Sequence, residues 1–332
     1  MYDCEQKVTF SDGLFTDICL NFIRYKRGLG QKFQGTNVYR LREICRQLNH
    51  EVTDTPVLTK DTACLIALRR ENEAQGTQLN RIGILRQLAE FMVSMGMEAY
   101  IYPAHYTLKY KYDFTPYIFS QDQIVSVIRA ADKMDYTPRS PNAHLVFPAL
   151  IRVLFGCGLR SSEVRKLKVS DVDLNNGVLT IVKSKNNISR YVPMSASLTE
   201  HLRQYSKALN FESGNGRYFF PSPFGGFYGE TVLRNRCNEL FAQADIPLLS
   251  NGRYPRVHDI RHSVIVHAYA NLTDTYHLDL YTAMPLIASY VGHTNIKDTE
   301  RYIHLPEFHY SNITSAGQAI IGASVPEVIF DE

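Results

Sequence analysis

Tyr290-Val-Gly-His-Thr-Asn-Ile-Lys-Asp-Thr-Glu-Arg-Tyr302 is the stretch that decides the interpretation of this chain, because it places His293 nine positions before Tyr302. About thirty residues upstream, His258-Asp-Ile-Arg261 puts a histidine and an arginine one helical turn apart. A third motif, Gly158-Leu-Arg160-Ser-Ser-Glu163, lies about a hundred residues earlier still. Two arginines, two histidines and a late tyrosine are the groups needed to attack a phosphodiester with a phenol.

Cleavage of a phosphodiester requires positive charge at the non-bridging oxygens and a proton for the leaving oxygen. A guanidinium group presents a rigid fork of donors and stays charged at any working pH, so it can replace a metal ion in this role. Arg160 and Arg261 are the candidates. His258 and His262 stand four positions apart and could instead ligate a metal, but the glutamate of the H-E-x-x-H zinc motif is missing between them.

Composition describes a folded chain that is long enough for two domains, with 332 residues of which 45% are hydrophobic and 21% charged. The formal net charge is only +3, so a DNA-binding surface would have to be local. We expect no signal peptide and no membrane span, because neither a basic-then-apolar start nor a long apolar run is present. Six cysteines without a C-x-x-C pair favour reduced thiols in a cytoplasm: Cys4, Cys19, Cys45, Cys64, Cys157 and Cys237.

Residues 11–100 are predicted to form a small helical domain, because apolar residues recur at intervals of three and four. The recurring positions include Leu14, Ile18, Phe22, Val38, Leu41, Ile44, Cys45 and Leu48. Residues 101–119 interleave tyrosines with prolines and with Lys109 and Lys111, which is typical of an extended linker. Either the two lysines rest on a DNA backbone, or the tyrosines of an ordered linker pack on both domains.

The second half is predicted to be mainly helical with one small antiparallel sheet. Ser120-Gln-Asp-Gln123 is a capping box that opens a helix, and residues 145–154 form an apolar, buried helix. Residues 177–182 and 190–193 are predicted strands on either side of Ser184-Lys-Asn-Asn187, a turn sequence. Residues 199–303 are again mainly helical, interrupted by the loop at 221–226.

The ordered motifs resemble the tyrosine recombinase (phage integrase) family, and the match extends to a lysine in a β-turn and an acidic residue three positions after the first arginine. The resemblance implies an N-terminal, SAM-like core-binding domain at 1–105, a linker at 106–119 and a catalytic domain at 120–332. Within the last, a tail at about 304–332 either docks on its own domain or inserts into a neighbouring protomer. Patterns near residue 30 and at 116–119 also resemble integrases of mobile elements.

The family also implies a role for each candidate residue. Tyr302 attacks the scissile phosphate and forms a 3′-phosphotyrosyl link, while Arg160, Arg261 and His293 bind the non-bridging oxygens. His258 assists proton transfer, and Lys185, with Lys183 as its competitor, protonates the leaving 5′ oxygen. Glu163 orients His258 or Arg160. We find no nucleotide-binding loop of the P-loop type, and we expect no cofactor, no metal and no ATP requirement.

The expected partner is double-stranded DNA carrying inverted-repeat core sites. The resemblance further implies a homotetramer on paired sites, a monomer or dimer when free, a place for accessory recombinases, and a location in the bacterial cytoplasm at the nucleoid. Two other functions remain open on the sequence alone. One is a catalytically silent accessory DNA-binding protein, and the other is strand relaxation of the type IB topoisomerase kind.

Overall fold

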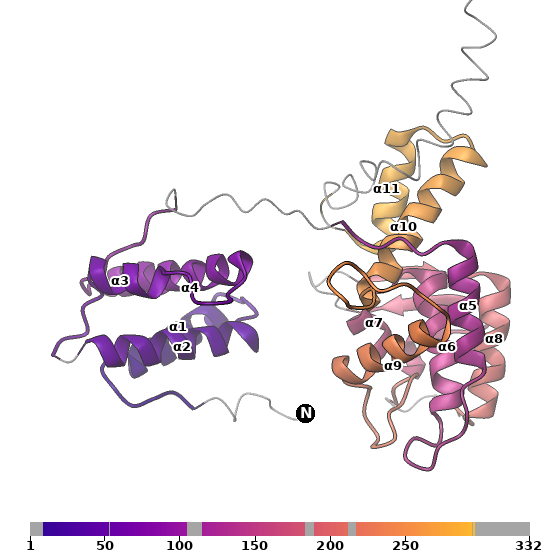
Figure 1. The fold of residues 1–332 in the computed structure, drawn as a ribbon, viewed down its shortest axis with the longest axis horizontal. Helices are drawn as coiled ribbons and strands as arrows, with labels where there is room; N and C mark the ends of the chain where they lie inside the picture. The colour runs from indigo at the N-terminus through magenta and orange to yellow at the C-terminus, as the bar shows by residue number, and fades with distance from the viewer. Residues whose placement is uncertain are drawn as a thin grey trace, which may run out of the picture. The chain divides into compact units, whose positions relative to one another are not determined.

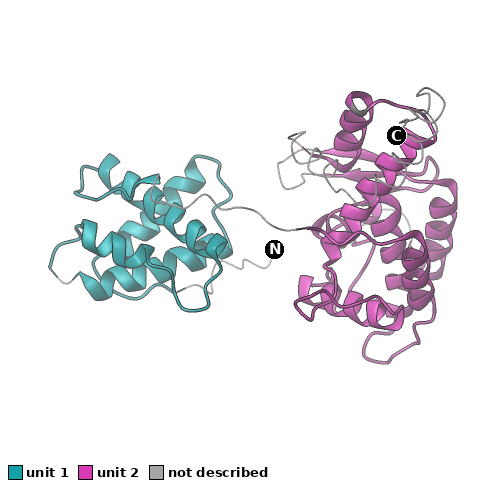
Figure 2. Ribbon diagram, turned by 45° about the horizontal axis from the view of Figure 1, so that its top comes forward, with its two compact units in different colours: residues 1–113 teal, residues 114–332 magenta. Residues whose placement is uncertain are grey.

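The computed structural model describes residues 9–52, 54–104, 115–182, 189–211, 217–293 and 295. The chain divides into two compact units, residues 1–113 and 114–332 (Figure 2). The described residues are mainly helical, and they contain one small sheet that lies in the second unit (Figure 1). This arrangement confirms the predicted fold class. Among the described residues, no helix is long and apolar enough to cross a membrane.

The first unit is built from four helices around one apolar core. They are α1 (Thr16–Gly28), α2 (Thr36–Glu51), α3 (Lys60–Ala67) and α4 (Gln75–Ser94). The predicted apolar face of α2 is buried as expected, and it packs on both α1 and α4. Leu14 was wrongly placed on a helical face: it is 38% exposed, because α1 begins only at Thr16 and Phe15 fills the core instead.

The second unit surrounds a central helix, α6 (Ala143–Cys157), which packs against α5 (Gln121–Asp132), α8 (Ala196–Ala208) and α10 (Val257–Asp274). Most of α6 is buried, which confirms the predicted apolar helix at 145–154. The capping box is also confirmed, because the Gln123 backbone N–H donates to Ser120 Oγ at 3.2 Å and the Ser120 N–H to Gln123 Oε1 at 3.0 Å. The remaining elements are α7 (Ser161–Arg165), η3 (Val169–Asp171), α9 (Glu230–Gln243) and α11 (Leu280–Val291).

The sheet has three antiparallel strands in the order β1 (Val172–Asp173), β2 (Val178–Ile181) and β3 (Arg190–Pro193). β2 and β3 are the two predicted strands, and their register pairs Ile181 with Arg190. β1 was not predicted, because two residues are too short to show an alternating pattern. Leu179, Ile181 and Val192 point into the core, so the same face of β3 also carries Arg190 inward.

Candidate active site

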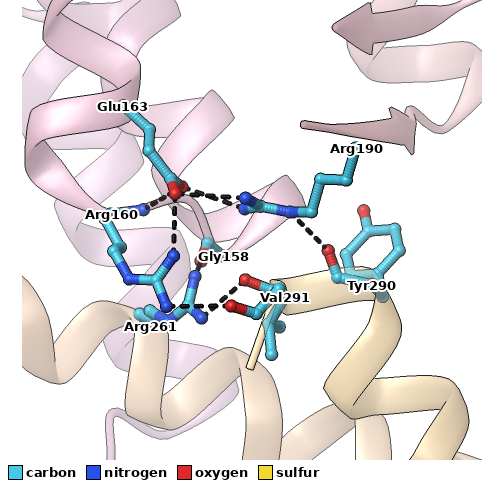
Figure 3. Close-up of polar contacts among 8 residues, drawn as sticks. Gly158, Arg160, Glu163, Arg190, Arg261, Tyr290 and Val291 are labelled. Carbon is cyan, nitrogen blue, oxygen red and sulfur yellow. Dashed lines mark hydrogen bonds and ion pairs between the residues drawn. The ribbon is translucent and has the colours of Figure 1, made fainter. Parts of the chain in front are cut away.

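A buried carboxylate, that of Glu163, holds two arginines together (Figure 3). Arg160 donates its backbone N–H to Glu163 Oε2 at 3.0 Å and its Nη1 to Oε1 at 2.8 Å. Arg190 donates Nη1 to Oε1 at 3.1 Å and Nη2 to Oε2 at 2.9 Å. The pairing of Arg190 with the carboxylate is therefore bidentate, and its two hydrogen bonds fix the plane of the guanidinium as well as its position.

The charge of Glu163 is secured by these arginines. Burial by itself would raise the pKa of Glu163, whose side chain is 4% exposed. The hydrogen bonds and charge of Arg190, aided by Arg160, outweigh this effect and lower the pKa to about 2. Glu163 is therefore ionised at neutral pH, and it offsets part of the charge of two closely placed guanidinium groups.

The other ends of the same two arginines bind the last turn of α11. Arg160 Nη2 donates to the Gly292 carbonyl at 3.0 Å, and Arg190 Nε donates to the Tyr290 carbonyl at 3.0 Å (Figure 3). Helix α11 can end here because Gly292 adopts a φ of 72°, which lets the His293 N–H donate to the Ala288 carbonyl at 2.9 Å. His293, which is half-buried, is thereby placed directly after the carbonyl that holds Arg160.

Arg261, which lies on α10, links the end of α6 to the end of α11. Its Nη1 donates to the Gly158 carbonyl at 2.8 Å and its Nη2 to the Val291 carbonyl at 2.7 Å (Figure 3). Gly158 ends α6 with a φ of 58°, so a left-handed turn presents this carbonyl as well. Arg261 is only 2% exposed, and among the residues that the structure describes it is the largest of the almost fully buried side chains.

His258 occupies the first turn of α10, one turn before Arg261, and it is exposed. Asp259 fixes the start of the helix, because it accepts the Arg256 backbone N–H at 2.7 Å. The His258 ring packs edge-on against His262, with centroids 4.7 Å apart. Where the chain is described, no group of three or more potential ligands could hold a metal ion there or elsewhere.

An open cleft of about 950 Å³ lies beside this histidine. Its wall includes Ser161, the residue after Arg160, together with Arg234, Asn238 and Arg253. Polar and basic groups therefore form part of the wall, beside Glu230 and apolar residues such as Leu233 and Leu248, at the point where α7, α9 and α10 approach one another.

The structure brings five of the predicted site residues into one region: Arg160, Glu163, His258, Arg261 and His293. Of the two partners that the sequence left open for Glu163, the observed contact is with Arg160. The predicted nucleophile Tyr302, the candidate lysines Lys185 and Lys183, and Lys109 and Lys111 lie outside the described residues. The predicted tail lies outside them too.

Arg190 is a member of this network that the sequence reasoning missed, since it was used there only to mark a strand. One signal could have found it. In an alternating strand Arg190 shares the face of Val192, which is a core position, whereas Tyr191 between them is 75% exposed. An arginine on an inward face requires a buried acidic partner.

Comparison with known proteins agrees with this geometry. Residues 118–308 match the phage integrase family. The chain is 29% identical over 301 residues to y4rB of Sinorhizobium fredii, a protein named as an integrase/recombinase, covering 87% of this chain and 92% of that one. It is 27% identical over 233 residues to the tyrosine recombinase XerD of Rhizobium meliloti, covering 70% of each.

Two solved structures share the fold. XerH recombinase bound to a palindromic difH substrate superposes with a TM-score of 0.63 at 17% identity, covering 92% of this chain and 97% of that one. The Tn1549 transposon integrase in complex with transposon right end DNA superposes with a TM-score of 0.61 at 15% identity, covering 91% of this chain and 99% of that one. Fold and motifs thus define a tyrosine-type site-specific recombinase. The chain belongs to the phage integrase family, as its motifs predicted.

Proposed function

We propose that this protein cuts and rejoins duplex DNA through a 3′-phosphotyrosyl link formed by Tyr302, without a metal ion or ATP. The observation that carries the proposal is the arginine cluster around Glu163 and the end of α11. It gathers Arg160, Arg190 and Arg261, and the Glu163 carboxylate pairs with the first two of them. A site with excess positive charge and fixed donors suits a phosphodiester anion.

Arg160 and Arg261 bind the non-bridging oxygens of the scissile phosphate. The hydrogen bonds of each guanidinium to backbone carbonyls fix its plane, so the donors need no reorganisation when charge develops on the phosphate. His293 follows the carbonyl that Arg160 binds, and it adds a further donor to the same phosphate. Arg190 does not need to touch the DNA, because its role is to hold Glu163 and the last turn of α11 in place.

In the cleavage step the Tyr302 oxygen forms a bond to phosphorus while the bond from phosphorus to the 5′ oxygen breaks. A tyrosine phenol in water has a pKa near 10, so a tyrosine nucleophile needs a proton acceptor and a positive field. His258 accepts the proton of Tyr302, and Lys185 gives a proton to the leaving 5′ oxygen. A 5′ hydroxyl from a second strand then reverses the step, which conserves the bond energy and makes ATP unnecessary.

Duplex DNA with inverted-repeat core sites is the proposed substrate. DNA complexes of XerH and of the Tn1549 integrase, which have the same fold, support this choice. Residues 1–105 clamp the duplex from one side, with Lys109 and Lys111 of the linker on its phosphates. Four protomers assemble on two sites, from free monomers or dimers and with accessory recombinases where a target requires them. Exchange of the tail at 304–332 couples neighbouring active sites.

Covalent trapping tests the nucleophile. The protein is mixed in EDTA with labelled duplexes from the flanks of its own gene, nicked so that the cut fragment escapes, and analysed on denaturing gels. The wild type should form an adduct that Tyr302→Phe abolishes. Tyr281→Phe is the matched control, because this tyrosine is 87% exposed on α11 and should leave the adduct unchanged. An adduct that persists in Tyr302→Phe would show that another residue is the nucleophile.

The tail has its own test. Deleting residues 318–332 should weaken the pairing of two DNA sites, measured by a gel shift of the paired complex, while binding to a single site is retained. An equal loss of single-site binding would contradict exchange between protomers.

A further inference from the structure

The hairpin at 221–227 projects a bare aromatic ring into solvent. Phe224 stands at its tip and is 96% exposed, the largest value for a bulky apolar residue in the parts of the chain that the structure describes. A single exposed apolar side chain is common on protein surfaces and needs no explanation. This hairpin is different because hydrogen bonds in its turn and contacts at its base fix the backbone that carries the ring.

The turn is closed by three hydrogen bonds. The Gly225 N–H donates to the Ser222 carbonyl at 3.1 Å, the Ser222 N–H to the Gly226 carbonyl at 2.9 Å, and the Gly226 N–H to Ser222 Oγ at 3.3 Å. Pro223 suits the second position of such a turn, and Gly225 has the φ of 83° that its last loop residue requires. Phe224 is the one tip residue whose type the turn does not require.

The base of the hairpin is fixed to the core of the second unit. Pro221 and Phe227 form an isolated bridge, and the ring of Phe227 lies 5.2 Å from that of Tyr218. Arg165 donates Nη1 to the Tyr228 carbonyl at 2.8 Å, and its guanidinium lies 5.8 Å from the Phe227 ring. Arg165 is the last residue of α7, so the helix that starts after Arg160 also supports the hairpin.

Three exposed cations flank this base: Lys166, Lys168 and Arg217. They lie on two backbone segments joined by hydrogen bonds, from the Phe219 N–H to the Leu167 carbonyl at 2.7 Å and from the Val169 N–H to the Arg217 carbonyl at 2.9 Å. The Lys166 ammonium sits 5.4 Å from the Phe227 ring. Two acids lie nearby, Asp171, which accepts the Lys168 backbone N–H, and Glu230, which is 3.8 Å from Arg165.

The distance from the phosphate site is short. α7 has five residues, so at 1.5 Å per residue Lys166 lies roughly 9 Å along the chain from Arg160. A duplex held at Arg160 rises about 3.4 Å per base pair, so phosphates about two to three base pairs away come level with the three cations.

We propose that the tip of this hairpin inserts Phe224 between base pairs of the bound duplex, a few steps from the scissile phosphate, while Lys166, Lys168 and Arg217 contact the flanking phosphates. The inference rests on the proposed function, because it takes the same duplex as its ligand. A stiff apolar wedge beside cations is the combination by which proteins unstack a base step and hold it open. Duplex DNA is favoured over a second protomer because three exposed cations flank the base of the hairpin.

The chain contains no tryptophan, so Phe224→Trp introduces a single fluorescent reporter at the tip. In a Tyr302→Phe background, a mixed-sequence duplex should quench this emission and shield it from iodide. Tyr136→Trp is the matched control, since Tyr136 is 61% exposed between α5 and α6 and its reporter should not respond. Fluorescence anisotropy of labelled DNA records binding in parallel.

Each outcome decides a different point. Binding of the duplex with unchanged emission from the Phe224→Trp variant would overturn the wedge and leave the proposed function standing. Emission that changes with protein concentration before DNA is added would overturn it in favour of a second copy of the chain. A chain that binds no duplex at all would overturn both proposals. In addition, Phe224→Ala should weaken DNA binding roughly fivefold or more, with an unchanged melting temperature.

The cations are tested by the salt dependence of binding. Changing Lys166, Lys168 and Arg217 together to Gln should reduce the slope of log K against log salt concentration by about 2–3, at about 0.9 per phosphate contact. The control changes Arg129, Lys133 and Lys207 to Gln. These lie on α5 and just after it, and on α8, at the far edge of the unit from α7 (Figure 1), and their removal lowers the net charge equally. Equal slopes for the two triple variants would overturn the surface.

Discussion

Two residues on one helix, Arg261 and His258, occupy opposite environments one turn apart. Arg261 is 2% exposed and is held by two backbone carbonyls, whereas His258 is exposed at the rim of the cleft. The two environments match two different chemical roles. A group that must present charge in a fixed direction is buried within a network, and a group that must exchange protons faces solvent and substrate.

Loss of the buried Arg261 side chain should have the largest effect on strand cleavage. Arg261→Ala removes a donor of the phosphate and leaves the Gly158 and Val291 carbonyls without their bonds to it. We expect strand cleavage to fall on the order of 10³ in single-turnover assays. Added guanidinium should not restore activity, because the side chain it replaces is almost fully enclosed. Restoration by guanidinium would show that the Arg261 site is open to solvent, and it would contradict the contrast drawn between Arg261 and His258.

Glu163 should make the free energy of unfolding of the second unit depend on pH. Its folded pKa of about 2 is lower than the unfolded value of about 4.3, so its contribution of about 3 kcal/mol is present above pH 5 and is lost as the pH falls toward 2. Glu163→Gln should therefore be less stable at pH 7 and lose less stability on acidification. Urea unfolding across this pH range measures both effects.

Asp132→Asn is the control for that series. Asp132 pairs with Arg152 at 2.6 Å, but its side chain is 43% exposed, so its loss should cost less than about 1 kcal/mol. Equal losses in the two variants would mean that burial does not strengthen the Glu163 network.

His258→Ala should slow cleavage on the order of 10², the lower end for general acid–base catalysis, because water reaches this position. Since the cleft is open, added imidazole should recover part of the rate, in contrast to Arg261→Ala with guanidinium. His262→Ala is the neighbouring control. Absence of any rate loss in His258→Ala would remove this residue from proton transfer.

Arg190→Lys should have the smallest effect, on the order of tenfold in rate, because a lysine cannot reproduce the bidentate pairing with Glu163. A purely structural role would lower stability alone. A positioning role should in addition raise the pKa of Glu163, seen as acid unfolding at higher pH than in the wild type. Unchanged acid unfolding would contradict the role assigned to Arg190.

The sequence predicted the parts of the site whose spacing is local. Arg160 and Glu163 stand one helical turn apart, as do His258 and Arg261, so motif and geometry coincide. The two predicted strands and the capping box followed from alternation and from local hydrogen bonding. Arg190 could not be assigned to the site in this way, because its partner is 27 positions away.

The contacts that close the network are also long-range. Arg160 meets Gly292 across 132 positions, and Arg261 meets Gly158 across 103. A motif indicates that such groups are needed, but only the packing of α10 against α6 and α11, and of α11 against β3, shows which carbonyls orient them. The glycines at the ends of α6 and α11 matter for the same reason, since their left-handed turns expose those carbonyls.

If the arginines neutralise charge on the scissile phosphate, a neutral phosphate analogue should remove much of the need for them. Single-turnover cleavage by Arg160→Ala is compared on a phosphodiester and on a methylphosphonate at the scissile position. Arg152→Ala is the control, because Arg152 has a similar exposure (22% against 17% for Arg160) but pairs with Asp132, outside the Glu163 network. We expect Arg160→Ala to be strongly impaired on the phosphodiester and largely restored on the methylphosphonate. Equal impairment on both substrates would contradict this expectation.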